Sequence, residues 1–289
     1  MFFNLYNIVI IMNLQINKIS NKTYNIVTYN IAGNKPSFNL YNIVNVLKPL
    51  NADVICLQEV CLDVDFFNKM RLEPNRSTQA HAIAHYLGYQ YCIFGQTLKD
   101  KYYGIAIISK LPIVYIERVD LPRGSLTQTT TNQTNIPIRM PGAKEPRLAL
   151  CAIISPIPEN ADSNFIVICT HFGLYNSHDI ETEIAKMPIS IISNYINHPK
   201  FADMPTILAG DLNIEPDNNM LSWLAEEWII PVKNTNTFID KDVPNIEKEI
   251  DYIATRHNNK IVMSTQNVVI NEITKYSSDH FPLVASISM

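Results

Sequence analysis

Glycine is scarce in this chain, with 8 residues among 289, and proline is ordinary at 17. That composition excludes collagen-like chains and disordered chains rich in both residues. Long apolar runs are also missing, because none approaches the roughly 18 residues that a membrane-spanning helix needs, so we expect no integral membrane span. The net charge of -4 argues against a protein that holds long duplex nucleic acid by charge alone.

Cysteine is present but follows no metal-binding pattern. The five cysteines stand at 56, 61, 92, 151 and 169, with no CxxC spacing and no histidine pair that completes a zinc set. Most of them lie in apolar runs, which fits either free thiols of a reducing compartment or simply buried small hydrophobic residues. The cysteines therefore favour a cytoplasmic protein and leave secretion open.

The first residues form an extension ahead of the main pattern. Phe2–Met12 is apolar, but no Lys or Arg precedes it and no small-residue cleavage site follows it. The segment fits a short extra strand, a poor signal segment, or a start placed too early, with Met12 as the initiator. We predict an N-terminal extension over 1–22 and a single domain over 23–289, and we expect a monomer.

Short apolar runs rich in β-branched residues dominate the chain and predict strands. The clearest predicted strands are Tyr24–Tyr29, Val54–Leu57, Ile105–Ser109, Leu148–Ile154, Phe165–Cys169, Thr206–Ala209, Ile250–Ala254 and Leu283–Ile287. Helical periodicity falls between several of them, over Leu40–Leu47, His81–Leu87, Ile180–Tyr195 and Asn219–Glu226. Strands with interspersed helices and no Gly/Ser-rich linker predict one α/β domain whose sheets are covered by helices.

One segment, Pro122–Pro146, has no regular pattern and is rich in Thr, Asn and Gln. Such a loop is either a substrate-facing insertion or a surface excursion, and both interpretations stay open. Basic residues concentrate around it, which fits either a rim that steers phosphate or ordinary solvated charge. These residues are Lys99, Lys101, Lys110, Arg118, Arg123, Arg139, Lys144 and Arg147.

Polar side chains follow directly on the ends of several predicted strands. They are Asn30, Gln58–Glu59, Thr170–His171, Gly210–Asn213 and, just before the last strand, Ser278–His280. Strand ends at one edge of a sheet converge in space, so we expect these groups to form one pocket.

The residue types in this predicted pocket suit metal-assisted hydrolysis of a phosphate ester. Carboxylate and amide oxygens are ligands of hard cations such as Mg²⁺ or Mn²⁺, and the candidates are Glu59, Asp211, Asp279, Asn30 and Asn213. His171 and His280, with Asp251 to orient one of them, suit proton transfer. The sequence contains no nucleophile elbow, P-loop or catalytic cysteine signature that would indicate a different class of enzyme. This inventory favours in-line attack by water.

Nine short stretches support this interpretation by their order along the chain. They are TYNIAG (28–33), DVICLQEV (53–60), YGIAIISKLPI (103–113), EPRLAL (145–150), ICTHFGL (168–174), ILAGDLNIEPD (207–217), NTFID (236–240), EIDYIAT (249–255) and SSDHFPLV (277–284). In this order they resemble the endonuclease/exonuclease/phosphatase superfamily, which includes deoxyribonuclease I, AP endonucleases, neutral sphingomyelinases, deadenylases and inositol 5-phosphatases. The resemblance implies a four-layer α/β sandwich: two mostly antiparallel sheets packed face to face, with helices outside.

The same resemblance implies a role for each matching acidic or amide residue. Glu59 is expected to be the principal metal ligand, with Asn30 and Asp279 nearby in the coordination shell or just outside it. Asp211 is expected to position or activate the attacking water, and Asn213 to hold a phosphate oxygen.

The basic residues receive implied roles as well. His280 is expected to contact the scissile phosphate or to transfer a proton, held by Asp251. His171 is expected to stabilise the phosphate or to act as the acid. Arg147 stands where many relatives carry a phosphate-facing basic residue, and the alternative is an ordinary surface arginine on a strand.

Departures from two specialised branches narrow the expected substrate. QEV at 58–60 stands where AP endonucleases usually have QETK, and IEKEIDYI at 246–253 replaces the WCDR-type stretch of inositol 5-phosphatases. We therefore expect a Mg²⁺- or Mn²⁺-dependent, nuclease-like phosphodiesterase whose partner is a phosphate ester, with nucleic acid as one candidate. The alternatives are a phospholipid (sphingomyelinase-like) phosphodiesterase, a soluble phosphomonoesterase, and a non-catalytic pseudo-hydrolase that serves as a binding scaffold.

Overall fold

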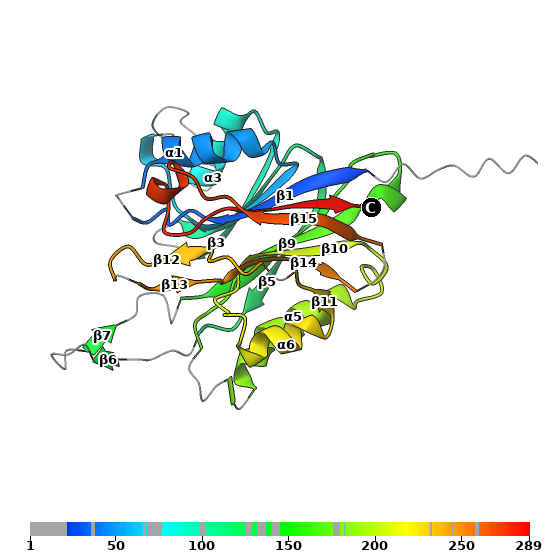
Figure 1. Ribbon diagram of the computed structural model, residues 1–289. Helices are drawn as coiled ribbons and strands as arrows, with labels where there is room; N and C mark the ends of the chain where they lie inside the picture. The colour runs from blue at the N-terminus through cyan, green and yellow to red at the C-terminus, as the bar shows by residue number, and fades with distance from the viewer. Residues whose placement is uncertain are drawn as a thin grey trace, which may run out of the picture.

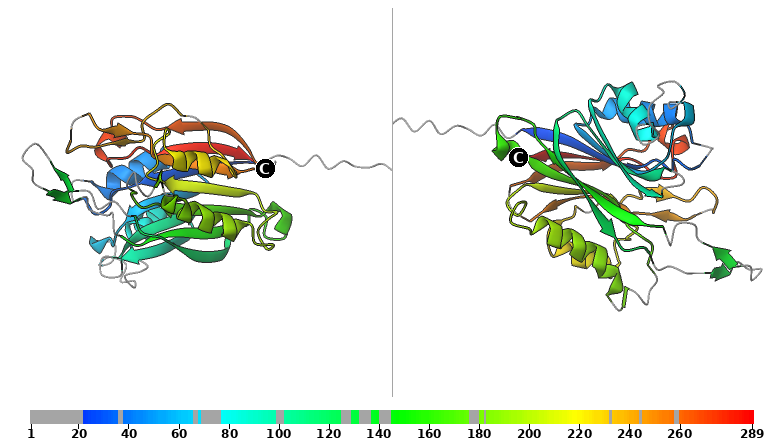
Figure 2. Two further views of the ribbon diagram at one scale, coloured as in Figure 1. Left: turned by 90° about the horizontal axis from the view of Figure 1, so that it is seen from below. Right: turned by 180° about the vertical axis from the view of Figure 1, so that it is seen from behind.

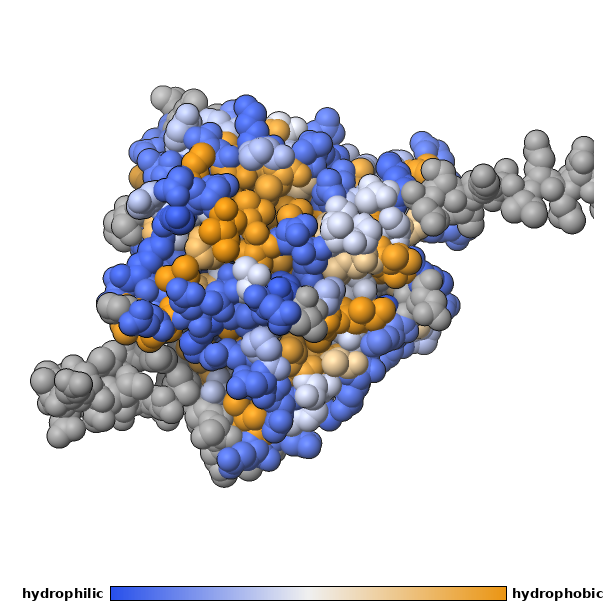
Figure 3. Space-filling view, viewed as in Figure 1, coloured by the Kyte–Doolittle hydropathy of each residue, from blue (hydrophilic) through white to orange (hydrophobic). Residues whose placement is uncertain are grey.

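Two six-stranded sheets stack face to face, and helices cover their outer faces (Figures 1 and 2). The computed structural model describes residues 22–289, apart from 36–37, 66–67, 69–76, 99–101, 125–128, 132–136, 140–144, 176–179, 182, 232, 244 and 258–259. Hydrophilic side chains cover much of the face seen in Figure 3, with hydrophobic patches between them. Within the described residues, every helix is too short or too polar to span a membrane.

The first sheet has the strand order β15-β16-β1-β2-β4-β3. Its strands are β1 (Thr23–Asn30), β2 (Val54–Val60), β3 (Tyr91–Leu98), β4 (Tyr103–Ser109), β15 (Val262–Val268) and β16 (Leu283–Ser288). β1 and β2 run parallel, and all other neighbours in the sheet are antiparallel. The carboxyl ends of the two central strands therefore lie at the same edge.

The second sheet repeats this plan with the order β11-β14-β10-β9-β8-β5. Its strands are β5 (Ile113–Leu121), β8 (Arg147–Ile154), β9 (Phe165–His171), β10 (Thr206–Asp211), β11 (Trp228–Ile229) and β14 (Asp251–Arg256). Here β9 and β10 form the single parallel pair. Two small antiparallel sheets pair β6 (Thr129–Thr131) with β7 (Pro137–Arg139) and β12 (Phe238–Ile239) with β13 (Glu247–Lys248).

The helices complete the four layers. The first sheet is covered by α1 (Leu40–Leu47) and α3 (Gln79–Leu87), and the second by α5 (Met187–Ile196) and α6 (Asn219–Ala225) (Figure 1). In the described part of the chain, four short 3₁₀ turns connect elements, at Lys48–Leu50, Ala161–Ser163, Ile184–Lys186 and Thr274–Tyr276. The predicted four-layer α/β sandwich with two mostly antiparallel sheets is confirmed.

Strand β9 shows how one apolar run serves two layers of the core. Phe165, Val167 and Cys169 point into the layer between the sheets, whereas Ile166 and Ile168 point toward α5 and α6. Side chains alternate across a strand, so a strand that is covered on both faces needs an unbroken apolar sequence. That requirement explains why β9 could be recognised from its composition.

The eight predicted strands are all present, and they are the inner four strands of each sheet. The four strands of these two sheets that were not predicted, β15, β3, β11 and β5, are the sheet edges, and the short strands β6, β7, β12 and β13 of the two small sheets were not predicted either. Edge strands are partly exposed and carry mixed sequences: β5 alternates half-buried and exposed residues along most of its length. Their composition is therefore a weaker strand signal.

Three of the four predicted helices are confirmed, and the fourth, predicted over Ile180–Tyr195, is interrupted before α5. Ile180 and Glu181 are helical, but Glu183 has a φ of 61°, and a 3₁₀ turn over Ile184–Lys186 precedes α5, which begins at Met187. Pro188 stands in the first turn of α5, where its missing N–H and fixed φ suit a helix start. Helical periodicity alone could not locate this boundary.

Two predictions fall largely outside the described residues. Phe2–Met12 lies within the undescribed residues 1–21, so the N-terminal extension stays a prediction. Much of Pro122–Pro146 is also undescribed, as are Lys99, Lys101 and Lys144 of the predicted basic rim. The role of that loop and the rim therefore remains a prediction.

Candidate active site

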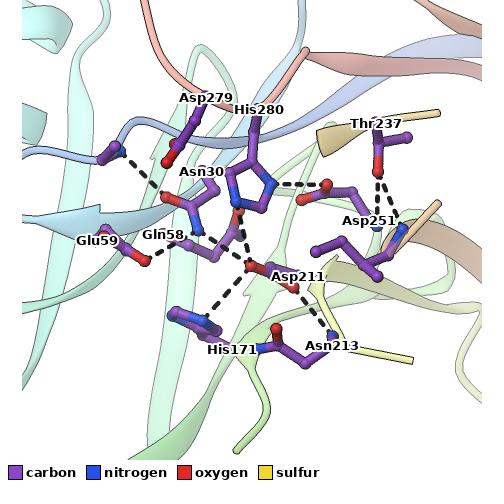
Figure 4. A network of polar contacts seen from close by, with 12 residues as sticks. Asn30, Gln58, Glu59, His171, Asp211, Asn213, Thr237, Asp251, Asp279 and His280 are labelled. Carbon is purple, nitrogen blue, oxygen red and sulfur yellow. Dashed lines mark hydrogen bonds and ion pairs between the residues drawn. The ribbon is translucent and has the colours of Figure 1, made fainter. Parts of the chain in front are cut away.

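The carboxyl ends of the two parallel strand pairs meet between the sheets. In the first sheet, Asn30 at the end of β1 lies opposite Gln58 in β2. In the second, Asp211 at the end of β10 lies opposite His171 of β9 on one side and Asp251 of β14 on the other. Because β1 stacks on β10, the polar groups of both sheets reach one centre (Figure 4).

Asp211 lies at the middle of this centre and is only 2% exposed. Its Oδ2 accepts a hydrogen bond from Asn30 Nδ2 at 3.0 Å, and the Nε2 atoms of His171 and His280 lie 3.5 and 3.7 Å away. Burial, followed by the nearby charge of Asp251, raises the pKa of Asp211 to about 7. A carboxylate with such a pKa can accept and return a proton near neutral pH.

His280 forms a buried pair with Asp251, whose Oδ2 lies 2.9 Å from His280 Nδ1. Burial opposes the charge of the imidazole, but the attraction of Asp251, Asp211 and Asp279 outweighs it and raises the pKa of His280 to about 10. His280 is therefore an imidazolium at neutral pH, with one N–H on Asp251 and the other facing Asp211.

A short segment around Thr237 fixes the position of that pair. Its Oγ1 accepts hydrogen bonds from the backbone N–H groups of Ile250 and Asp251 at 3.1 and 3.0 Å. Its carbonyl accepts from the N–H of Phe281, and the N–H of Ile239 donates to the carbonyl of Asp279. The NTFID stretch thus lies between the two segments that carry Asp251 and His280.

His171 differs from His280 in its charge state. Its Nδ1 lies 3.0 Å from Nη1 of Arg147, and because a guanidinium can only donate, Nδ1 must accept. Burial, Arg147 and His280 together hold the pKa of His171 well below its ordinary value. His171 is therefore neutral, with its proton on Nε2 facing Asp211. Arg147 is only 5% exposed, which excludes the alternative of an ordinary surface arginine.

Glu59 reaches the site through a backbone distortion. Its φ is 55°, in the left-handed region that a glutamate rarely adopts, and the register of β2 against β4 shifts between Leu57 and Val60. Such a bulge turns a side chain away from the regular alternation of the strand. Burial raises the pKa of Glu59, although the charge of His280 opposes the shift.

Asn213 is the second site residue in the left-handed region, with φ at 54°. Its backbone N–H donates to Asp211 Oδ1 at 2.9 Å, which closes a turn directly after β10. Its Nδ2 donates to the carbonyl of Phe172 at 3.0 Å, so the amide is held against the end of β9. Two of the eight non-glycine residues with positive φ in the described part of the chain, Glu59 and Asn213, therefore belong to the site.

Glu59, Asn30 and Asp279 form an oxygen-rich group on one side of His280 (Figure 4). Asn30 Nδ2 donates to Glu59 Oε1 at 3.3 Å. The Nζ of Lys35 lies 2.5 Å from Asp279 Oδ2, so a cationic group already lies against these acids. Carboxylate oxygens with a neighbouring amide fit a hard divalent cation.

Asp211, Asp251 and His280 form a second set of potential metal ligands. One ligand atom from each lies within 4.8 Å of the other two. However, His280 is protonated and bonded to Asp251, whereas a histidine that binds metal must be deprotonated. The Glu59–Asp279 group is therefore the better candidate for a divalent cation, and the closer cluster is a proton-bearing ion pair.

The structure brings together every residue predicted for the site, and it adds lysines that the sequence did not reveal. Besides Lys35, the buried Lys233 donates from Nζ to the carbonyl of Asp251 at 2.8 Å and pairs with Glu249 at 3.1 Å. Its ammonium also lies 3.8 Å from the centre of the Tyr252 ring. Lys233 follows a proline-containing loop with no periodic pattern, so no local signal marked it.

The fold and the site together define a two-sheet α/β sandwich with a buried Asp–His centre where the parallel strands end. The model of the endonuclease/exonuclease/phosphatase family matches residues 27–280, and the chain belongs to this family. The family generally hydrolyses phosphate esters and generally depends on divalent metal ions.

Individual relatives are distant in sequence. The mouse (Mus musculus) Protein angel homolog 2 is 25% identical over 196 residues, which are 66% of this chain and 31% of that protein, so the chain spans less than a third of this curated relative. An endonuclease/exonuclease/phosphatase from Beutenbergia cavernae has a TM-score of 0.64 at 21% identity, covering 92% of this chain and 72% of the other. ANGEL2, a 2′,3′-cyclic phosphatase in complex with adenosine-2′,3′-vanadate, has a TM-score of 0.61 at 16% identity, with coverage of 94% and 97%. Such identities show a shared fold.

The charge of His280 should make the stability of the metal-free protein depend on pH. Its pKa rises on folding from 6.5 to about 10, so its stabilising contribution is complete below about pH 6.5 and is lost as pH rises toward 10. We expect the difference in unfolding free energy between wild type and His280→Gln to shrink by more than about 1 kcal/mol between pH 7 and 10. Urea unfolding in EDTA measures it, and a difference independent of pH would contradict the assigned charge.

Proposed function

We propose that this protein is a divalent-metal-dependent phosphodiesterase that acts by in-line attack of water. The observation that carries the proposal is the buried carboxylate of Asp211, with nitrogen atoms of Asn30, His171 and His280 around one oxygen. A pKa of about 7 suits Asp211 to act as a general base at neutral pH. All groups that such a reaction needs lie together, which argues against a non-catalytic scaffold.

Glu59 and Asp279 would hold the divalent cation, with Asn30 beside them. A bound Mg²⁺ or Mn²⁺ supplies positive charge that stabilises the negative charge developing on the phosphate and the leaving oxygen. Asn30 links this group to the base, because its Nδ2 contacts both Glu59 and Asp211. A shift of one carboxylate would therefore be transmitted to the other.

In the proposed reaction, Asp211 accepts a proton from the attacking water while the water oxygen forms a bond to phosphorus. The bond from phosphorus to the leaving oxygen breaks on the opposite side, and its electron pair stays on that oxygen. Asn213 follows Asp211 in a fixed turn and uses one amide proton on Phe172. Its second amide proton is available to a phosphate oxygen.

The two histidines have different proposed roles because their charges differ. With a pKa of about 10, His280 keeps its proton at neutral pH, so it can stabilise the phosphate by charge and an N–H. His171 is neutral and offers Nε2–H. Arg147 fixes its tautomer and adds a permanent positive charge.

Within the phosphodiesters, a nucleoside 2′,3′-cyclic phosphate is the substrate class that we propose first. A structural relative with this fold is described as a 2′,3′-cyclic phosphatase, and its complex contains adenosine-2′,3′-vanadate. A 2′,3′-cyclic phosphate is itself a diester, so one attack by water opens it to a monoester. A phospholipid, a longer nucleic acid and a soluble monoester are the alternatives that direct assays must separate.

Replacing Asp211 with Asn removes the proton acceptor at nearly constant volume. We expect hydrolysis of bis(p-nitrophenyl) phosphate to fall by about 10²–10⁴-fold, and His280→Ala to cause a comparable loss. Circular dichroism should show an intact fold. Asp217→Asn, on the exposed loop just beyond, is the matched control and should keep the wild-type rate. Undiminished turnover in both Asp211→Asn and His280→Ala would contradict the assignment of the active site.

Replacing Glu59 with Gln should act mainly on the metal. The loss of one ligand charge should move the Mg²⁺ titration of activity to concentrations about 10–100-fold higher. Glu226→Gln, which changes an exposed glutamate, should leave the titration in place. If Glu59→Gln also leaves it in place, the cation is bound elsewhere.

The substrate class can be resolved by a panel assayed with Mg²⁺, with Mn²⁺ and with EDTA. It includes adenosine 2′,3′-cyclic phosphate, RNA, linear DNA, a choline phospholipid and p-nitrophenyl phosphate. We expect metal-dependent opening of the cyclic phosphate to be fastest, with the monoester slower than bis(p-nitrophenyl) phosphate. Faster cleavage of the monoester than of every diester would replace the phosphodiesterase assignment.

A further inference from the structure

Lys35 makes the one ion pair in the described residues that joins a surface loop to the proposed metal ligands. Its Nζ lies 2.5 Å from Asp279 Oδ2, and the negative charge of Glu59 also attracts it. The lysine side chain is 39% exposed, whereas that of Asp279 is 9% exposed. One partner is therefore free to move into solvent, and the other is held in the site.

The backbone around Lys35 is anchored to the distorted part of β2. The N–H of Gly33 donates to the carbonyl of Glu59 at 2.9 Å, and Gln79 donates to the carbonyl of Gly33 at 3.1 Å. A Cβ on Gly33 would come within 2.6 Å of the Glu59 carbonyl, so the contact requires glycine. The N–H of Lys35 then donates to the carbonyl of Ala32 at 2.9 Å. Lys35 thus starts from a position fixed relative to Glu59.

The ammonium of Lys35 also has an alternative environment close by. It lies 5.9 Å from the centre of the Phe38 ring, and Lys241 Nζ lies 4.6 Å from the same ring. Lys241 is bonded to the carbonyls of Lys275 and Ser278 and makes no ion pair with Asp279. The two lysines share an aromatic neighbour, and Asp279 attracts both, but the direct ion pair with this proposed metal ligand is made by Lys35.

We propose that Lys35 is a built-in counter-cation of the metal site, and that divalent-cation binding displaces its ammonium from Asp279. The inference rests on the proposed function, which assigns Asp279 and Glu59 to the cation. An ammonium and a divalent ion on the same carboxylate repel each other strongly, so the two compete for it. Lys35 thereby stabilises the metal-free site, lowers its affinity for metal, and gains a free ammonium near the site when metal binds.

The test is calorimetric titration of Mn²⁺ into the metal-free full-length chain. Lys35→Met removes the competing charge but keeps the apolar stem, and we expect it to bind Mn²⁺ about five- to tenfold more tightly than wild type. Lys35→Arg keeps the charge and should stay near wild type. Lys241→Met is the comparison variant, because it removes an ammonium that Asp279 attracts without a direct ion pair, and it should raise the affinity less than Lys35→Met does.

Melting temperatures with and without Mn²⁺ distinguish displacement of the Lys35 ammonium from a general effect of changing the net charge. Without metal, Lys35→Met should melt at a lower temperature than wild type, because the direct ion pair with Asp279 is lost and the repulsion between Glu59 and Asp279 is less fully compensated. Saturating Mn²⁺ should raise its melting temperature by more than that of wild type. Mn²⁺ affinity of Lys35→Met equal to that of wild type overturns the proposal.

The failure of the proposed function would look different. If Glu59→Gln binds Mn²⁺ as tightly as wild type, the metal site itself is misassigned, and the Lys35 proposal falls with it. If Glu59→Gln weakens binding while Lys35→Met leaves it unchanged, only the counter-cation proposal fails.

Discussion

The burial of one carboxylate, Asp211, is the constraint on which the rest of the structure depends. An ionisable group that is 2% exposed needs partners, because burying an unpaired charge is far more costly than folding can offset. The partners come from both sheets: Asn30 from the first, and His171 and His280 from segments that meet at the ends of the parallel strands. Packing the sheets face to face and assembling the site are therefore one event. The same burial raises the pKa of Asp211 into the range where a base can act at neutral pH.

The sequence predicted the inner strands because burial on both faces leaves a clear record in composition. β8, β9 and β10 are buried along their whole length, and each ends in or begins with a residue of the site. A polar residue after an unbroken apolar run is therefore a position where the core meets the site. The order of several such junctions made the family resemblance visible. The edge strands and the start of α5 were not predicted, because partial exposure and a proline-led turn leave no comparable sequence pattern.

The remaining features depend on contacts that no local pattern records. The bond between Asn30 and Asp211 joins residues 181 positions apart, and it decides the geometry of both. Glu59 adopts a backbone conformation that its residue type disfavours, held by the bulge and by Gly33. The different charge states of the neutral His171 and the protonated His280 follow from which partner each meets, Arg147 or Asp251. Lys35 and Lys233 lie in loops, where sequence gives no indication of burial or pairing.

Two acidic groups compete as the place of the cation, and their separation around His280 makes the central claim directly measurable. Anomalous diffraction from crystals soaked in Mn²⁺ locates the metal without reference to activity. We predict one dominant peak beside the carboxylates of Glu59 and Asp279, with the ammonium of Lys35 moved away and the pair of His280 with Asp251 intact. A dominant peak among Asp211, Asp251 and His280 would contradict it, because the proposed base and its imidazolium would then be metal ligands.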